Sequence, residues 1–333
     1  MRCRSGPFFR TCVAFTAFWF ILAPIMKRWV LLLLLWGSVA TAQERVMFWN
    51  LENFFDYRND TTSVSDAEFS SFGERRWTKK RFYAKCNAVA KAILWAGGTM
   101  GGLPDVVGFA EVENGFVLRR LLQVTALRKT DYSIVHYDSP DRRGIDVALL
   151  YRRSRLTLLD ASPCHIYGAD SSVMATRDIL MAHFTGPGGD LAVLVNHHPS
   201  KYGGASSEPR REMAVRRLAF LADSLIGAGV TRVVAMGDFN DTPDAPAYTI
   251  LPMVNLALPF HARGEGTIKY DGKWELIDLY FVSDSLRESR MGILRVPFLL
   301  KADGTGRKPL RTYSGPRYLG GVSDHCPVWL DVK

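Results

Sequence analysis

The sequence predicts an α/β (α+β) fold in which two packed β-sheets are flanked by a few helices. Most apolar segments are short, rich in β-branched residues and followed by polar residues, which is typical of strands. Only two stretches show clear helical periodicity, too few for a strictly alternating parallel sheet. Of the 333 residues, 47% are hydrophobic and 23% are charged, a composition that allows a sizeable core.

Residues 1–42 are predicted to be an export signal. Met26-Lys27-Arg28 gives a short basic start, residues 29–36 form an apolar run, and Ala40-Thr41-Ala42 is a small-residue cleavage pattern. The run is too short to span a bilayer comfortably, which favours cleavage near Ala42 and a secreted or periplasmic protein. An earlier apolar stretch, residues 8–25, leaves a membrane-anchored alternative open. We expect Met26 to be the true start.

The net charge of +9 overstates the basic character of the mature chain. Five of the 42 lysines and arginines lie in residues 1–42, together with no acidic side chain. This leaves 37 basic against 33 acidic side chains, a net charge of +4. Such a balance indicates a mild preference for anionic partners.

Three cysteines remain in the mature chain: Cys86, Cys164 and Cys326. Their odd number and irregular spacing indicate neither a metal site nor a disulfide framework, although one disulfide is compatible with an oxidising compartment.

The predicted elements follow one another without a linker, so we expect one domain over residues 43–333. A strand at residues 46–49 precedes a polar loop over residues 57–77. Thr78 can then cap a helix that the glycines and proline of residues 97–104 end. A second amphipathic helix is expected over residues 208–226. Eight further segments are predicted to be strands: residues 106–110, 132–136, 145–151, 180–184, 191–196, 230–236, 276–282 and 328–332.

Polar side chains gather directly after the predicted strands. An acid at one strand end is usually a turn former or a helix cap. Here six strand ends in succession carry acids, amides or imidazoles, which turns alone do not explain. The six segments are FWNLEN (48–53), GFAEVEN (108–114), VNHHPS (195–200), MGDFND (236–241), IDLY (277–280) and VSDH (322–325).

Phosphodiester hydrolysis needs groups of these kinds. Carboxylates such as Glu111 and Asp324 are the oxygen ligands that a hard divalent cation prefers. A carboxylate with an amide neighbour, as in Asp238 and Asn240, suits the deprotonation or alignment of water.

The remaining groups suit the phosphate itself. Imidazolium or amide donors must meet the charge on the phosphoryl oxygens, and His197, His325 and Asn50 can supply them. A histidine in that role needs a carboxylate behind it to fix its tautomer and charge, and Asp278 is available.

Together these motifs resemble the endonuclease/exonuclease/phosphatase superfamily. The segments WNLEN, FAEVEN, RRGIDVALLYR, VNHHPSKYGG, GDFND, IDLYFVS and SDHCPVWL occur in the family's order between residues 48 and 330. GDFN and SDH are the most specific of them. The resemblance implies a four-layer sandwich of two mainly antiparallel β-sheets flanked by helices. Members of the superfamily include deoxyribonuclease-like enzymes, apurinic/apyrimidinic endonucleases, sphingomyelinases and inositol polyphosphate phosphatases.

The resemblance also implies roles for single residues. Glu111 would be the principal metal ligand, with Asp324 in the metal shell. Asp238, with Asn240 beside it, would align or activate the attacking water. Asn50 would help to position the metal and the phosphate.

On the imidazole side, His325, supported by Asp278, would contact the scissile phosphate. His197 matches the family's imidazole or phenol after the asparagine and is expected in the catalytic set, whereas His198 is expected to be structural. Glu52 is expected to be either a metal neighbour or a surface acid. Arg143 is expected either to touch the substrate phosphate or to be a solvated loop arginine.

The leading hypothesis is an exported nuclease, most simply an endonuclease, that hydrolyses DNA or RNA with Mg²⁺, or with Mn²⁺ or Ca²⁺. After signal cleavage it would be a monomer with no membrane anchor and no stable protein partner. The alternative keeps the chemistry and changes the substrate to a lipid headgroup or an inositol phosphate. A binding protein on a degenerate scaffold should have lost one of the carboxylates or imidazoles named above, and none is missing.

Overall fold

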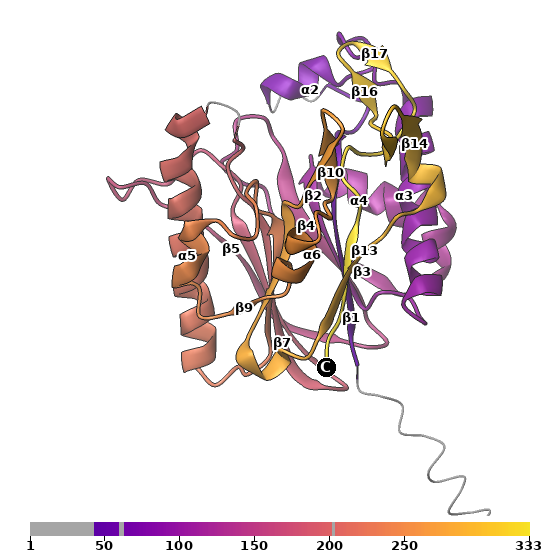
Figure 1. Cartoon of the computed structure of the whole chain (residues 1–333). Coiled ribbons are helices and arrows are strands. Elements are labelled where there is room, and N and C mark those ends of the chain that lie inside the picture. The colour runs from indigo at the N-terminus through magenta and orange to yellow at the C-terminus, as the bar shows by residue number, and fades with distance from the viewer. Residues whose placement is uncertain (1–42, 60–62, 202–203) are drawn as a thin grey trace, which may run out of the picture. The chain divides into compact units, whose positions relative to one another are not determined.

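Two six-stranded sheets dominate the computed structural model, which describes residues 43–59, 63–201 and 204–333 (Figure 1). The predicted export signal, residues 1–42, lies outside the described residues. The first sheet has the order β13-β18-β1-β2-β4-β3. Its strands are β1 (Arg45–Phe54), β2 (Val106–Val112), β3 (Tyr132–His136), β4 (Asp146–Arg152), β13 (Arg290–Ile293) and β18 (Val328–Asp331).

The second sheet has the order β5-β6-β7-β8-β12-β9. In each sheet one neighbouring pair is parallel, β1 with β2 and β7 with β8, and the other pairs are antiparallel. Its strands are β5 (Thr157–Cys164), β6 (Ile179–Gly186), β7 (Gly189–His197), β8 (Val233–Asp238), β9 (Val254–Asn255) and β12 (Asp278–Val282).

Helices cover the outer faces of the two sheets (Figure 1). Helices α3 (Lys79–Thr99) and α4 (Gly115–Val124) pack on the first sheet, and α5 (Glu208–Gly227) packs on the second. This arrangement confirms the predicted sandwich. The shorter helices are α2 (Val64–Glu68) and α6 (Leu258–Ala262), with 3₁₀ turns η1 (Ala126–Lys129), η2 (Gly204–Ser207), η3 (Pro246–Ile250), η4 (Asp284–Leu286) and η5 (Pro297–Leu299).

Small hairpins decorate the C-terminal half of the chain. They are β10 (Ile268–Tyr270) with β11 (Lys273–Glu275), β14 (Leu300–Asp303) with β15 (Gly306–Pro309), and β16 (Tyr313–Ser314) with β17 (Arg317–Tyr318).

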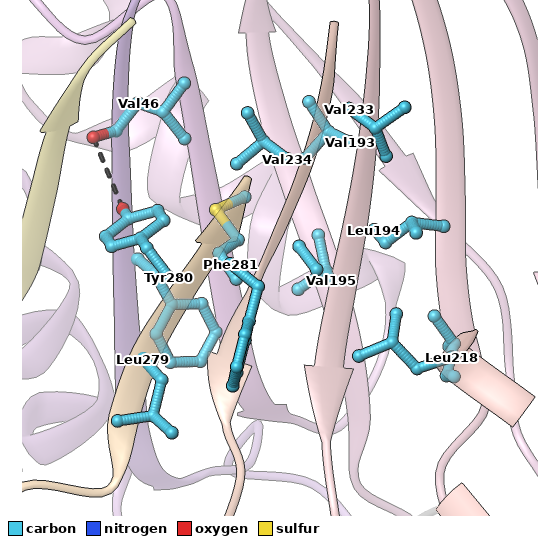
Figure 2. Close-up of a cluster of buried hydrophobic side chains, with 14 of the residues drawn as sticks. Val46, Val193, Leu194, Val195, Leu218, Val233, Val234, Leu279, Tyr280 and Phe281 are labelled. Atoms are coloured by element: carbon cyan, nitrogen blue, oxygen red, sulfur yellow. Dashed lines mark hydrogen bonds between the residues drawn. The ribbon is translucent and has the colours of Figure 1, made fainter. Parts of the chain in front are cut away.

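The core follows from the two-residue period of the strands. In β1, Val46 and Phe48 face the second sheet, while Met47 and Trp49 face the helices. Figure 2 shows Val46 beside Tyr280 of the opposite sheet, whose hydroxyl donates to the Val46 carbonyl at 3.3 Å. The sheets approach closely at Gly108 of β2, where an added Cβ would lie 2.4 Å from the Met236 methyl group.

Several boundaries differ from the sequence-based prediction. Strand β1 continues past residue 49 to Phe54, because a bulge lets it keep pairing with β2. Helix α3 runs through Gly97 and Gly98, where packing outweighs the low helix propensity of glycine. Apolar periodicity places Leu94 on the same face of this helix as the buried Ile93, but the structure leaves it 39% exposed. The pattern missed α2, α4 and the edge strand β5, in which Cys164 alone is buried.

Cys86, Cys164 and Cys326 are buried free thiols, so no two of these three described cysteines form a disulfide with each other. Over the described part of the chain, no helix combines the length and the apolar character needed to cross a membrane.

Candidate active site

The predicted strand ends converge where the two sheets meet. Asn50 ends the regular part of β1, and its side-chain amide donates to Asp238 Oδ2 at the end of β8, at 2.9 Å. Asp278 begins β12 directly opposite Asp238. One hydrogen bond therefore joins the two sheets at the position that the sequence predicts for the chemistry.

Four residues at this edge hold a left-handed backbone: Glu52 (φ 46°), Asn53 (φ 52°), Glu111 (φ 61°) and Asn240 (φ 50°). Each such non-glycine conformation costs ~1–3 kcal/mol and persists only where surrounding contacts enforce it. The β1–β2 register shifts between Asn50 and Phe54, and the β2–β4 register shifts at Glu111. The two bulges bring the Asn53 N–H to Glu111 Oε2, at 2.7 Å.

Asp238 lies at the centre of this cluster and is 2% exposed. Its Oδ1 accepts from the Asn240 N–H at 2.9 Å, and its Oδ2 lies 3.7 and 3.8 Å from Nε2 of His197 and His325. Burial raises the pKa of Asp238 to about 7, against the opposing attraction of His325. A carboxylate with this pKa is matched to proton transfer near neutral pH.

His325 is held as an imidazolium. Its Nδ1 lies 2.8 Å from Asp278 Oδ2. Burial by itself lowers the pKa of His325, but Asp278, Asp238 and Asp324 together raise it well above the ordinary value. Its backbone is fixed as well, because the Trp49 indole donates to its carbonyl at 2.9 Å. The side chain is therefore a fixed cationic donor.

The two neighbouring histidines differ from His325. Burial and nearby cations, Arg177 first among them, hold the pKa of His197 well below its usual range, so this residue is neutral. Burial and Arg177 lower the pKa of His198 to about 3. The His198 ring packs edge-on against Phe239, with the ring centroids 4.7 Å apart, and its Nε2 lies 3.3 Å from Asn196 Oδ1, which fits the structural role expected for it.

Carboxylate oxygens at the edge of the cluster fit a divalent cation. Among the described residues, Glu111 Oε1 makes one long contact, 3.5 Å, with the Asn50 amide. Asp324, with one-third of its side chain exposed, pairs through Oδ2 with Arg311 at 3.1 Å, and its Oδ1 lies 3.8 Å from His325 Nε2. Oxygen ligands that keep partial access to water suit Mg²⁺ or Mn²⁺.

Asp238, Asp278 and His325 also offer possible ligand atoms within 4.8 Å of one another. In this triplet the 2.8 Å hydrogen bond already occupies His325 Nδ1, and all three side chains are buried.

Glu52 is 6% exposed, so it is not a surface acid. Its Oε1 accepts from Arg311 Nε and its Oε2 from the Thr312 N–H, both at 2.9 Å. Burial and the nearby Asp324 raise the pKa of Glu52 to about 7, while Lys85 and Arg311 oppose this shift. Both carboxylate oxygens are thus already engaged beside the candidate metal ligands.

Arg143 reaches the site, and the structure adds three cations that the motifs did not single out. Arg143 Nη2 donates to Asn53 Oδ1 at 2.6 Å. Buried Arg177 donates to the His198 carbonyl at 2.6 Å, and buried Lys85 donates to the Glu52 carbonyl at 2.6 Å. Arg311 is the third. Nothing in their sequence surroundings marked these three residues.

Known proteins share this architecture. Among solved structures, a humanized TDP2 from D. rerio aligns with a TM-score of 0.56 at 15% identity, covering 88% of this chain and 100% of that chain. The catalytic domain of human Nocturnin aligns with a TM-score of 0.54 at 15% identity, covering 88% and 94%. A Bacteroides thetaiotaomicron mannosyl-6-phosphatase aligns with a TM-score of 0.56 at 13% identity, covering 87% and 99%. Identities this low establish the fold and not the substrate.

No curated protein sequence matches the chain. The model of the Endonuclease/Exonuclease/phosphatase family, however, matches residues 45–333, nearly the whole described chain. The sandwich and the match over its full length agree, and the chain belongs to the endonuclease/exonuclease/phosphatase family.

Proposed function

We propose that this protein is an exported, metal-dependent phosphodiesterase that cleaves nucleic acid. The observation that carries the proposal is the convergence of Asp238, the His325–Asp278 pair and the Glu111 carboxylate at one edge of the sandwich. Enzymes of this family are divalent-metal-dependent hydrolases of phosphoester bonds. That the substrate is a phosphodiester, that it is nucleic acid and that the protein is exported are the parts that we propose.

Each side chain then has a task in hydrolysis. Ionised Asp238 takes a proton from water, and Asn240, which donates to Oδ1 of Asp238, keeps the carboxylate aimed. Asn50 and His325 donate to the phosphoryl oxygens, where negative charge grows in the transition state. Neutral His197 adds a further donor or acceptor on the same side.

The cation partners complete the assignment. Glu111 and Asp324 would hold Mg²⁺, or Mn²⁺ or Ca²⁺, and such an ion supplies Lewis-acid stabilisation of the phosphoryl oxygens. Arg143, fixed by Asn53, contributes positive charge next to Glu111. Glu52 lies beside these ligands as a metal neighbour, and its two oxygens hold Arg311 and the Thr312 N–H in place.

Cavities beside the site support a diester substrate. A polar cavity of about 150 Å³ shares Glu52 and Asn53 with the site. A larger one, of about 400 Å³, is lined by Lys201 and by Asp241, which follows Asn240. A phosphodiester carries a substituent on each side of the scissile phosphate, and the two cavities offer room for both.

Two further observations favour nucleic acid. Arg143 and Lys201 lie on loops at the site and suit a phosphate backbone. Among the structural neighbours is a D. rerio TDP2 complexed with a single-strand DNA product, with a TM-score of 0.52 at 15% identity.

Export by a cleaved signal rests on the sequence of residues 1–42. They combine five cations, an apolar run and a small-residue site at Ala42, with no acidic side chain.

The test is a substrate panel with and without Mg²⁺. Plasmid DNA, RNA, sphingomyelin and an inositol phosphate are incubated with purified protein, and the expected result is cleavage of nucleic acid only when Mg²⁺ is present. Nuclease activity should fall steeply as salt rises, because binding to the phosphate backbone releases counterions. If both nucleic acids stay intact while sphingomyelin or the inositol phosphate is consumed, the nuclease assignment is wrong and phosphoesterase chemistry remains.

A further inference from the structure

The 150 Å³ cavity beside the candidate metal ligands combines two residues of the WNLEN segment with residues that no motif singled out. It lies between the bulge of β1 and the hairpin β16–β17, and it is lined in part by Glu52, Asn53, Arg75, Arg311 and Ser314. Figure 1 shows this hairpin close to α2, at the same end of the sandwich as the carboxyl end of β1. The cavity therefore opens beside the candidate site and shares residues with it.

Arg311 is fixed by two carboxylates and keeps donors to spare. Its Nε bonds Glu52 Oε1 at 2.9 Å and its Nη2 bonds Asp324 Oδ2 at 3.1 Å. A guanidinium carries five N–H donors in a rigid fork, so this clamp leaves others free to point elsewhere. The Arg311 side chain is 52% exposed, which leaves it accessible to a ligand in the cavity.

Glu52 is the acid of the cavity lining, and neighbouring donors already bind its carboxylate. The Thr312 N–H bonds its second oxygen at 2.9 Å, and the buried ammonium of Lys85 bonds its carbonyl at 2.6 Å. Lys85 also bonds Thr312 Oγ1 at 3.0 Å. An anion entering the cavity thus meets a carboxylate whose two oxygens each accept a hydrogen bond, with Lys85 and Arg311 as well as Asp324 beside it.

Arg75 supplies a second, pre-oriented cation. Its guanidinium bonds Glu68 at 2.6 Å and the Gly315 carbonyl, and it lies 5.7 and 5.6 Å from the ring centroids of Phe69 and Tyr313. The Tyr313 hydroxyl donates to the Arg75 carbonyl at 2.9 Å. Because these contacts already restrict the Arg75 side chain, it loses little further conformational entropy when it binds an anion.

We propose that this cavity binds a second phosphate of the substrate, the one next to the scissile phosphate along the chain. Arg75 and Arg311 form charge-assisted hydrogen bonds to it, and Ser314 adds a hydroxyl. The assignment rests on the proposed function, because it needs a substrate with two phosphates in series. With such a site the enzyme prefers a phosphodiester that has a neighbouring phosphate, whether internal or terminal, over a phosphodiester that has none.

The experiment compares three dinucleotides with the purified full-length protein and Mg²⁺: TpT, pTpT and TpTp. The wild type should cleave one of the two phosphorylated dinucleotides with a kcat/KM on the order of tenfold higher than that for TpT, the ratio that one charge-assisted contact of ~1.4 kcal/mol supplies. Arg75→Gln should reduce that ratio to about one, and Arg75→Lys should restore part of it. Arg210→Ala, which removes an exposed arginine bonded to the Ala175 carbonyl, is the matched control and should keep the wild-type ratio.

The outcomes separate the two proposals. Equal constants for all three substrates in the wild type, or an unchanged preference in folded Arg75→Gln and in a second variant, Arg75→Met, overturn the second-phosphate site and leave the phosphodiesterase in place. If none of the three dinucleotides is cleaved, the proposed function fails and the second-phosphate site fails with it.

Discussion

Asp238→Asn is the change that best separates catalysis from folding in this protein. The substitution keeps the shape of the side chain and removes the base. Loss of general-base catalysis lowers the rate by ~10²–10⁴-fold, which is ~3–5 kcal/mol of transition-state stabilisation. The same substitution also removes a buried charge. Because that charge destabilises the fold when Asp238 is ionised, its removal should raise the free energy of unfolding.

The stability change follows from the contacts of Asp238. Burial raises its pKa from 3.8 to about 7. A folded-state pKa above the unfolded one means that ionisation weakens the fold as pH rises from about 4 to about 7, by up to ~4 kcal/mol. An amide escapes this cost but must lose one hydrogen bond, either to the Asn50 amide or to the Asn240 N–H, worth ~1–3 kcal/mol. At pH 8 the variant should therefore be as stable as the wild type or more stable.

The assay pairs hydrolysis of bis(p-nitrophenyl) phosphate with urea unfolding at pH 8. Asp284→Asn is the matched control, because Asp284 is an exposed aspartate that pairs with Arg287 at 2.6 Å and lies outside the cluster and the cavities. That variant should keep its activity within a few-fold. Two results refute the reasoning: activity of Asp238→Asn within tenfold of wild type, or a loss of more than ~2 kcal/mol in its free energy of unfolding.

Four further outcomes are expected. EDTA should abolish turnover and Mg²⁺ should restore it and raise the Tm; full activity after exhaustive chelation contradicts the metal assignment. Because the base must be ionised and the pKa of Asp238 is about 7, kcat/KM should fall as pH drops below about 7. The Asp278→Asn variant removes the carboxylate that raises the pKa of His325, so the alkaline limb of the pH profile of kcat/KM should move to lower pH. His325→Ala should lose activity with a modest loss of stability. His198→Ala should keep most of its activity but lose ~2 kcal/mol of stability, because it leaves a cavity against Phe239. The reverse ranking of the two variants means that the imidazoles were misassigned. Intact-mass measurement of the exported protein should show an N-terminus at Gln43, and a membrane-bound species that keeps residues 29–36 argues for an anchor instead.

The sequence by itself determined the family, the order of most strands and the residues at the strand ends. Each of these features depends on residues that are contiguous in the chain. A β-branched run predicts a strand, and segments such as GDFND and VSDH place polar residues within a few positions of a strand. Because the ends of neighbouring strands meet at one edge of a sheet, the proximity of Asn50, Asp238, Asp278 and His325 followed from the pattern. Their chemical roles remain predictions.

Only the tertiary structure decided which cations surround those carboxylates and how they are protonated. Arg311 is 259 residues from Glu52 along the chain, and Lys85 is 227 residues from Thr312, so no local pattern could pair them. The left-handed turns at Glu52 and Glu111 arise from bulges that pairing between distant strands enforces. The same holds for charge: His325 and His197 have the same intrinsic pKa, and burial near carboxylates makes the first an imidazolium, while burial near arginines keeps the second neutral.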